Sequence, residues 1–443
     1  MGWRCPPRRG IGFHLVLALY WFSLNYHWGA LLNVVVPFDV LHFVPETAKG
    51  RFLGVALALG AFVAMVVQPV AGALSDAFGS RWGRRRPFLL AGTLGTMAGL
   101  LCMAGATAFS LFVAAYVLVQ LSCNLAIAGY QGLMPDVVAE EERGRASGYM
   151  GLMTAAGSLC GIGLASWAMN SGARVPFYWS ISVVLFLGAL ITWWGVHEEP
   201  SARRPLRFRE FWQNFWVDPR HYPDFAWLFL TRFLVYLGFY TIMNFMLYYL
   251  RDAIVPQAVS LPVLGTVNYL GAQTAIGAVV LVGTAAASLV AGSLSDRMGR
   301  KPLVTGAASA MALGALVLVL RPPLPLVLGV GLVFGAGYGA YLSVEWALAT
   351  DCLPSAEEAG RYLGLWGIAM TLPQVIGPLL GGNILDLAAQ TAPGAGYAAL
   401  FSTALLYLGA GAVTVNRVRR GGKPVVAPEG RRGNGARSEG GRG

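Results

Sequence analysis

Charge is what this sequence has least of. Only 12% of its 443 residues are charged, against about 25% in an ordinary soluble domain, and 56% are hydrophobic. This composition, with a mean hydropathy of +0.59, indicates that most of the chain does not fold as a water-soluble domain. The net charge of +11 does not indicate nucleic-acid binding, because the basic residues lie in short turns between apolar runs, where the positive-inside rule accounts for them.

Cysteine and histidine are scarce as well, with five of each. The cysteines fall within apolar runs or predicted cytosolic pieces, so we expect neither a disulfide framework nor a metal site. The histidines have no metal-ligand spacing, and neither a nucleophile with a matching base nor a Walker-type nucleotide loop can be recognised. The sequence therefore argues against an enzyme, an ATP-driven pump and a bound cofactor.

Apolar runs long enough to cross a bilayer, about 20 residues each, make up most of the chain. The sequence predicts twelve spans, near 11–38, 52–75, 87–106, 109–134, 146–168, 176–196, 224–250, 268–291, 303–320, 324–349, 362–386 and 397–416. Because the longest polar break follows the sixth, the predicted fold is an all-α polytopic membrane protein with twelve transmembrane helices in two pseudo-symmetric six-helix bundles. The predicted parts are a cytosolic N-terminal segment (1–10), an N-terminal bundle (11–196), a cytosolic linker (197–223), a C-terminal bundle (224–417) and a disordered cytosolic tail (418–443).

The distribution of Lys and Arg predicts the orientation. With a cytosolic N-terminus, most basic residues fall in inner loops, and the opposite orientation would violate the positive-inside rule. We therefore expect a multi-pass monomer with both termini in the cytosol, and the short loops favour a bacterial inner membrane. The basic residues left in outer loops are Lys49, Arg51, Arg174, Arg251 and Arg321.

Two charged turns repeat at corresponding places in the two halves. One runs from Gly72 to Pro87 and the other from Gly292 to Pro302, and each closes one apolar run before the next begins. A second repeat follows the fourth span of each half, where an aspartate, Asp136 or Asp351, precedes a Gly-Arg pair that opens the fifth span. Two such repeats in the same order indicate a duplicated membrane protein.

These motifs resemble those of the major facilitator superfamily, whose hallmark loop reads Gly-x-x-x-Asp-(Arg/Lys)-x-Gly-Arg-(Arg/Lys). Residues 292–301 match it in full, whereas the first copy has Ala77 in place of a basic residue and the longer ending Gly79-Ser-Arg-Trp-Gly-Arg-Arg-Arg-Pro87. That ending is similar to the sucrose:proton symporter branch and the related glycoside-pentoside-hexuronide:cation symporters. The resemblance implies two bundles that alternate access to a midplane site.

Loops of this kind can favour one arrangement of the bundles. Their carboxylates accept hydrogen bonds from a helix N-terminus or pair with arginines only when helices approach. The alternative is that the charges only enforce topology, which needs Arg but neither Asp nor fixed glycines. The predicted gating residues are Gly72, Asp76, Arg81, Gly83, Arg84, Arg85, Arg86, Asp136, Arg145, Gly292, Asp296, Arg297, Gly299, Arg300, Lys301, Asp351 and Arg361.

Two charged residues stand out within spans, where a charge is costly unless it is paired or wet. Arg232 in the seventh span and Glu345 in the tenth lie at similar predicted depths, so we expect them to pair beside the transport path. They are candidates for proton coupling, as is His27, which titrates near neutral pH unless perturbed. The alternative for His27 is a structural hydrogen bond between helices.

Neutral polar side chains mark the predicted cavity. Tyr236, Tyr240 and Asn244 follow Arg232 at steps of four, which places them on one helix face. Phenol, amide and guanidinium groups suit a hydroxylated or zwitterionic solute, although the same groups also join helices to each other. The predicted cavity residues are Asn25, His27, Gln120, Asn124, Arg232, Tyr236, Tyr240, Asn244, Tyr338, Tyr341, Glu345 and Gln374.

The sequence therefore predicts a secondary transporter whose partners are a small-molecule solute, a proton or other cation, and the lipid bilayer. The first hypothesis is proton-coupled symport of a small polar solute such as a sugar or glycoside. An efflux antiporter for amphipathic compounds is the alternative within the same class. A receptor or scaffold with the same fold is the alternative from another class, and Arg232 and Glu345 argue against it, since a passive protein gains little from their cost.

Overall fold

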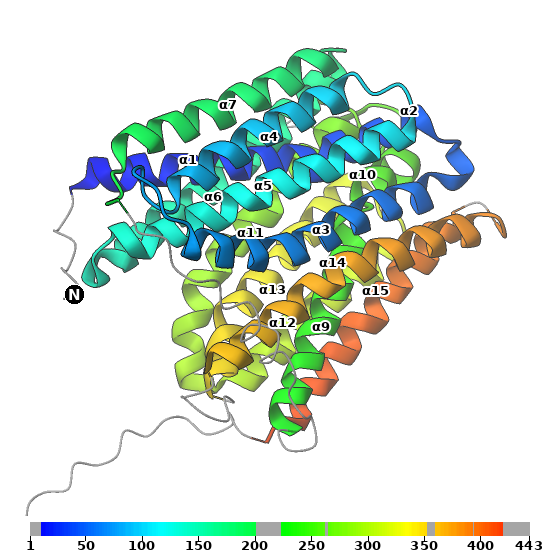
Figure 1. Cartoon of the computed structure of the whole chain (residues 1–443). Coiled ribbons are helices and arrows are strands. Elements are labelled where there is room, and N and C mark those ends of the chain that lie inside the picture. Colours follow the sequence, from blue (N-terminus) through cyan, green and yellow to red (C-terminus); the bar gives the residue numbers. More distant parts are fainter. Residues whose placement is uncertain (1–9, 201–222, 262–264, 352–358, 393, 420–443) are drawn as a thin grey trace, which may run out of the picture.

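The computed structural model describes residues 10–200, 223–261, 265–351, 359–392 and 394–419, most of them helical (Figure 1). The first helix, α1 (Ile11–Ala30), continues through the π-helical turn η1 (Leu31–Val35) into α2 (Val36–Phe43). The other elements of the first half are η2 (Glu46–Ala48), α3 (Lys49–Ala77), α4 (Arg86–Ala104), α5 (Phe109–Val137), η3 (Glu140–Glu142), α6 (Arg143–Asn170) and α7 (Arg174–Gly195).

The second half begins with α9 (Pro223–Met243), which breaks at Asn244 before α10 (Met246–Tyr249) and the π-helical turn η4 (Leu250–Ile254). An antiparallel hairpin of β1 (Val259–Leu261) and β2 (Gly265–Val267) leads into the next helix. The remaining elements are α11 (Tyr269–Met298), α12 (Arg300–Val319), α13 (Leu324–Asp351), α14 (Ala359–Ala389), α15 (Ala395–Thr414) and η5 (Val415–Arg417).

Eleven helices in the described part of the chain are long and apolar enough to cross a membrane. The first helix, α1, falls short on composition because His14, Asn25 and His27 lower its hydropathy, but it packs within the first half like the others. It makes the twelfth helix of the predicted set. The all-α polytopic membrane fold is therefore confirmed.

The helices pack in two groups. In the first, α1 packs against α6 and α7, and α4 against α5 and α7; in the second, α13 packs against α11 and α12, and α15 against α9 and α12. We call residues 10–200 the N half and residues 223–419 the C half. The predicted N-terminal segment, linker and tail lie wholly or mostly outside the described residues, so the predicted domain boundaries stay a prediction.

Glycines permit the closest helix contacts. A Cβ at Gly157 of α6 would lie 2.5 Å from the Phe22 carbonyl O of α1, and one at Gly161 would lie 2.2 Å from the Tyr26 carbonyl O. Only a residue without a Cβ therefore lets these two backbones meet. Because lipid tails are as apolar as side chains, such close packing, rather than hydrophobic burial, drives helix association in a membrane.

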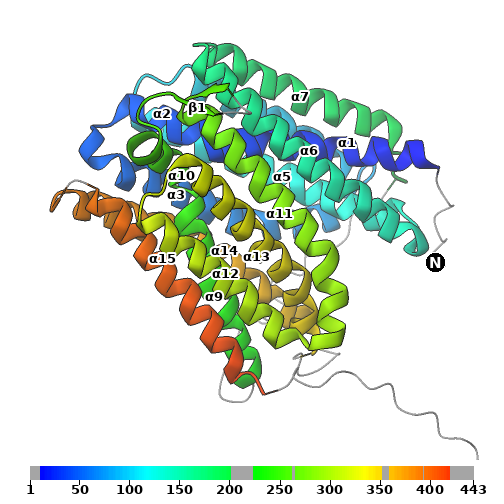
Figure 2. The same ribbon diagram turned by 180° about the vertical axis from the view of Figure 1, so that it is seen from behind.

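The two halves meet through α3 with α14 and α6 with α11, and these contacts lie toward one side of the protein (Figures 1 and 2). On α3, Gly50 and Gly54 touch α14, whereas Gly72, near the other end, has nothing within 4 Å of the position of a Cβ. We call the side of residues 44–50 the clasp side and the side of residues 78–85 the motif side. The halves diverge from the clasp side toward the motif side (Figure 1).

Candidate solute cavity and gating loops

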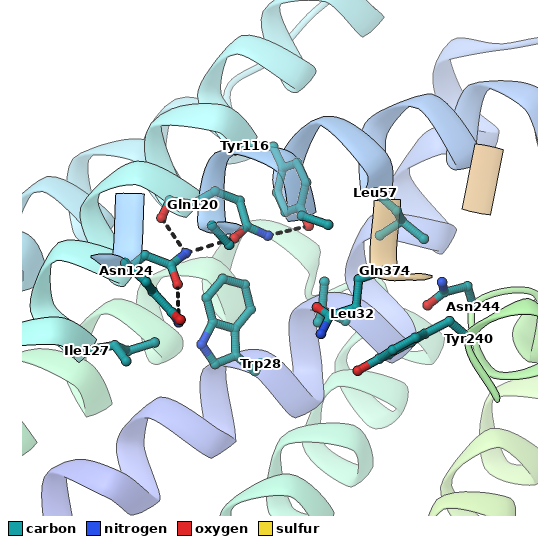
Figure 3. A pocket seen from close by; sticks show the side chains of 13 residues that line it. Trp28, Leu32, Leu57, Tyr116, Gln120, Asn124, Ile127, Tyr240, Asn244 and Gln374 are labelled. Carbon is teal, nitrogen blue, oxygen red and sulfur yellow. Dashed lines mark hydrogen bonds between the residues drawn. The ribbon is translucent and has the colours of Figure 1, made fainter. Parts of the chain in front are cut away.

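A cavity of about 240 Å³ lies between the halves (Figure 3). Its walls come from α1, η1, α3 and α5 of the N half, and from α9, the break at Asn244 and α14 of the C half. The predicted cavity residues that line it are Gln120, Asn124, Tyr240, Asn244 and Gln374. The lining residues that the sequence did not single out are Trp28, Leu32, Leu57, Ala61, Ala64, Gln68, Tyr116 and Ile127.

Amide and phenol groups form a hydrogen-bonded ladder on the N-half wall (Figure 3). Gln68 Nε2 donates to Asn124 Oδ1 at 2.8 Å, and Asn124 Nδ2 donates to Gln120 Oε1 at 3.2 Å. Gln120 Nε2 in turn donates to the Tyr116 hydroxyl at 2.6 Å. The ladder fixes the orientation of the amides, and their remaining donors and acceptors are available to a solute.

The cavity lining is electrically neutral. Among the described residues that line it, none is an Asp, Glu, Lys, Arg or His. Apolar side chains such as Trp28 and Leu57 line the wall beside the polar groups of the ladder and beside Tyr240, Asn244 and Gln374 of the C half (Figure 3). Neutral polar groups beside apolar side chains fix the orientation of a ligand without offering a counter-charge to an ion.

Asn25 and His27, which we expected in the cavity, lie away from it. Asn25 Nδ2 donates to the Trp21 carbonyl O at 2.8 Å, and a Cβ at Gly157 of α6 would lie 3.1 Å from the Asn25 Cβ, so this face of α1 packs against α6. His27 is fully buried, with its ring 4.5 Å from that of Trp28. Neither ring nitrogen of His27 has a hydrogen-bond partner among the described residues.

Arg232 and Glu345 lie together in the C half. Arg232 Nη2 is 3.6 Å from Glu345 Oε1, and both side chains are 6% exposed. Tyr236 donates its hydroxyl to Glu345 Oε1 at 3.0 Å, and the Arg232 guanidinium lies 4.3 Å from the Trp366 ring centroid. Among the described residues, Arg232 Nε and Nη1 have no hydrogen-bond partner. This buried pair is incompletely satisfied, a costly arrangement.

Tyrosines connect the pair to the cavity. The Tyr236 ring stacks against that of Tyr240, a cavity residue, with centroids 6.1 Å apart. Tyr338 and Tyr341 contact Tyr236 edge-on at 6.3 and 6.0 Å. The residues that we expected in the cavity but that lie behind Tyr240 are Arg232, Tyr236, Tyr338, Tyr341 and Glu345. Tyr338, Tyr341 and Glu345 belong to α13, which packs mainly on α11 and α12. Arg232 and Tyr236 lie on α9, before Tyr240.

The first charged loop is tied to the end of α5. Arg84 Nη2 donates to both oxygens of Asp136, at 2.7 and 2.8 Å, and Arg85 Nε donates to Asp136 Oδ2 at 3.3 Å. Arg85 also pairs with Asp76. Partial burial works to lower the pKa of Arg84, but its hydrogen bonds and attraction to Asp136 outweigh burial and raise the pKa. Asp76 and Asp136 are therefore held within the N half in this arrangement.

Glu198, which we did not single out from the sequence, anchors the start of the linker to this loop. Its carboxylate accepts the backbone N–H groups of Arg84, Arg85 and Arg86, at 2.9 to 3.2 Å. It therefore sits at the N-terminus of α4, where a negative charge is favourable. Gly83 has φ +88°, and a Cβ there would lie 2.2 Å from Glu198 Oε2, so glycine is required on both counts.

Aromatic rings hold the other arginines of the first loop. The Arg81 guanidinium lies 4.6 Å from the Trp82 ring centroid. Arg86 lies 4.2 Å from the Trp193 ring centroid and donates to the Trp193 carbonyl O. Both arginines thus rest on indole rings of the N half, an arrangement typical of the membrane interface.

The second charged loop is attached to the C half. Gly299 has φ +89° and ends α11. Arg300 donates to the Ala347 carbonyl O near the end of α13, and Lys301 donates to the Val418 carbonyl O. Arg84 joins the first loop to α5, the fourth long helix of the N half. Arg300 likewise joins the second loop to α13, the fourth long helix of the C half.

For the remaining predicted gating residues, no contact between the halves is found in the described part of the chain. Arg145 lies 3.8 Å from Glu142 of its own half. The side chains of Asp351 and Arg361 lie outside the described residues. Asp296 and Arg297 are exposed. A Cβ added at Gly72 or Gly292 would have nothing within 4 Å.

The family model of the Major Facilitator Superfamily matches residues 13–264 and 228–437. The multi-drug resistance efflux pump PmrA of Streptococcus pneumoniae is 26% identical over 387 residues, which cover 83% of this chain and 88% of that protein. The chloramphenicol resistance protein of Pseudomonas aeruginosa is 32% identical over 101 residues, or 23% of this chain and 24% of that protein. The match thus spans about a quarter of the length of relatives such as the chloramphenicol resistance protein, whereas it spans most of PmrA.

The fold is shared with solved transporter structures. A bacterial homolog of the human lysosomal transporter Spinster, in an inward-facing and unoccupied conformation, superposes with a TM-score of 0.67 at 14% identity, covering 93% of this chain and 96% of that chain. At this identity the likeness shows the fold alone. Since the family model matches both halves, and the helices pack in the corresponding fold, the chain belongs to the Major Facilitator Superfamily and is a membrane transporter rather than an enzyme.

Proposed function

We propose that this protein is a proton-coupled secondary transporter that exports a small uncharged organic solute. The cavity between the halves carries this proposal. Its neutral lining combines an apolar wall with a ladder of amides, and a tyrosine stack links it to a buried ion pair. The proposed solute site and the proposed charged site are in contact with each other through Tyr240.

The neutral lining favours an uncharged solute. An ion moved from water into a low-dielectric site loses several kcal/mol of solvation unless a counter-charge or several hydrogen bonds replace it. The described lining supplies no counter-charge. Amides such as Gln68 and Gln120 offer hydrogen bonds to a hydroxyl, carbonyl or amide group, while Trp28 and Leu57 offer apolar contact.

Glu345 is the proposed proton site and Arg232 its partner. While Glu345 is ionised, its charge and that of Arg232 compensate each other. Protonation of Glu345 would remove this attraction and leave the Arg232 charge without a counter-charge from Glu345. Because Tyr236 touches both Glu345 and Tyr240, a solute against Tyr240 would move the group that donates to Glu345. This contact is the proposed route of coupling.

The proposed orientation places the motif side in the cytosol, where the positive-inside rule puts most of the basic residues. The arrangement described above would then be closed toward the outside. Export is supported by the similarity to PmrA, an efflux pump, over most of both chains. The protein is proposed to act as a monomer in a bacterial inner membrane.

Sugar uptake by symport is the second candidate. The amide ladder favours it, because primary amides hydrogen-bond hydroxyl groups well. The ending Ser80-Arg-Trp-Gly-Arg-Arg-Arg-Pro87, similar to that of sugar symporters, also favours it. The two candidates share the cavity and the proton site and differ in the solute and the direction of its movement.

The test is transport in proteoliposomes with an imposed pH gradient, using a panel of uncharged amphipathic compounds, sugars and their charged analogues. We expect one or more uncharged compounds to move against their gradient when protons flow down theirs. Glu345→Gln is expected to lower this accumulation at least tenfold, because the glutamine cannot release a proton. The exposed Glu141→Gln serves as the matched control and should transport normally.

Accumulation that ignores the pH gradient and survives Glu345→Gln would contradict proton coupling. Accumulation of sugars alone, in the direction of proton flow, would favour the second candidate. Binding of a solute without any flux would indicate a receptor with the transporter fold.

A further inference from the structure

The N-terminus of α3 is capped from the other half of the protein. Ala48, the residue before α3, has no side chain that could cap the helix. Asp386 of α14 does so instead: its Oδ1 accepts the Gly50 N–H at 3.0 Å and its Oδ2 accepts the Arg51 N–H at 2.7 Å. The first N–H groups of a helix lack partners within it and carry the positive end of its dipole, so a carboxylate there is stabilising.

This contact requires the two backbones to touch. A Cβ at Gly50 would lie 2.7 Å from Asp386 Oδ1, and a Cβ at Gly382 would lie 2.1 Å from the Gly50 carbonyl O. At Gly54 a Cβ would lie 2.3 Å from the Pro378 carbonyl O. These glycines let α3 and α14 close tightly enough that Asp386 is only 8% exposed.

Two ion pairs surround the same junction, one of them well exposed and the other partly buried. Glu46 Oε1 lies 2.5 Å from Arg251 Nη2, and Lys49 Nζ lies 2.6 Å from Asp252 Oδ2, so each pair joins the N half to the C half. The Glu46 and Arg251 side chains are 57% and 30% exposed. An ion pair this accessible to water contributes little, whereas hydrogen bonds accepted by a buried carboxylate contribute more. The Lys49 and Asp252 side chains are less accessible, at 13% and 23% exposed.

We propose that Asp386 is the latch of the clasp side, a positioning residue that sets how often the halves separate there. Both hydrogen bonds to α3 must break when this side opens, because Gly50 and Arg51 belong to the half that moves away. The glycine contacts shape the latch, and the exposed Glu46–Arg251 pair adds little to it. The inference depends neither on the solute nor on the coupling ion.

The test is a distance measurement on the clasp side of the full-length protein in lipid nanodiscs. Spin labels are attached to Thr47→Cys and Gln390→Cys, both exposed and on opposite halves, after Cys5, Cys102, Cys123, Cys160 and Cys352 have been replaced by alanine. Electron–electron double resonance then gives the populations with short and long distances. We expect Asp386→Asn to raise the ratio of long to short about tenfold, a change of about 1.4 kcal/mol.

Two controls separate the latch from neighbouring charges. Glu46→Gln removes the exposed ion pair and should change the ratio by less than about threefold. Asp39→Asn removes a buried carboxylate that pairs with Arg174 and Tyr178 within the N half, so it should leave the ratio unchanged.

A third variant distinguishes a latch from a simple helix cap. Ala48→Asp, added to Asp386→Asn, gives α3 a cap of its own and should restore thermal stability without restoring the closed population. The proposal is overturned if Asp386→Asn leaves the distance ratio unchanged, or if Ala48→Asp restores it. If Asp386→Asn does not fold, Asp386→Glu takes its place; its longer side chain should shift the ratio in the same direction, and an unchanged ratio overturns the proposal equally.

Discussion

At the scale of single residues, Gln120 holds the middle of the amide ladder. Its side chain accepts from Asn124 and donates to Tyr116. We expect Gln120→Ala to raise the KM for the transported solute about fivefold to tenfold with little change in kcat, since one neutral hydrogen bond contributes about 1 kcal/mol. The measurement is the concentration dependence of transport in proteoliposomes.

A matched control lies on the same helix. Gln131 of α5 is exposed and does not line the cavity, so Gln131→Ala should leave KM unchanged. Asn124 also donates to the Gln120 backbone carbonyl at 2.7 Å, and Gln120→Ala does not remove that acceptor. Equal effects of the two substitutions, or a loss confined to kcat, would contradict a direct contact with the solute.

Residues with unusual chemistry for a membrane span could be selected from the sequence. Arg232 and Glu345 stand out because a charge there is costly, and the structure brings them together. Trp28 and Tyr116 do not stand out, because aromatic side chains are common in membrane helices, and only the packing decides which of them face a cavity. Asp386 lies at the very end of a predicted span, where a charge is ordinary.

At the scale of helices, the contact of α1 with α6 depends on Gly161. We expect Gly161→Val to lower the midpoint of thermal unfolding, because its Cβ would collide with the Tyr26 carbonyl O and overpacking costs about 1–3 kcal/mol. Gly151→Val, on the same helix, is the control, since nothing lies within 4 Å of its Cβ position. Circular dichroism of both purified variants makes the comparison, and equal midpoints would contradict this role of Gly161.

Helix positions could be predicted from apolar length, but their ends could not. The predicted span 52–75 corresponds to α3 (Lys49–Ala77), because polar and charged residues continue a helix beyond the apolar core of the membrane. The break of the helix at Asn244 could not be predicted from the sequence either. Neither glycine nor proline lies there, and Asn244 itself lines the cavity.

At the scale of the whole molecule, the orientation in the membrane can be tested by labelling. In the cysteine-free background, we expect Trp82→Cys to react with a membrane-impermeant maleimide only in inverted vesicles and Thr47→Cys only in intact cells. Both positions are exposed and lie on opposite sides of the protein. The reverse pattern would contradict the orientation derived from the basic residues.

The duplicated loops predicted two halves of like design, but not where the halves touch. If the halves alternate as proposed, contacts such as α3 with α14 exist in one arrangement and are lost in the other, and such states commonly differ by only a few kcal/mol. The sequence pattern does not identify which side chains meet across the halves in a given arrangement. The Asp386 contact with Gly50 and Arg51 is therefore visible only in the structure.

The neutral cavity lining has an electrical consequence. If the solute carries no charge, the membrane potential exerts no force on it, and the only charge that crosses the membrane is that of the coupling ion. One elementary charge moving through 100 mV releases about 2.3 kcal/mol, which sustains a concentration ratio of about 50-fold. Each transport cycle would then draw a current, and the voltage alone would set a gradient of solute even without a difference in pH.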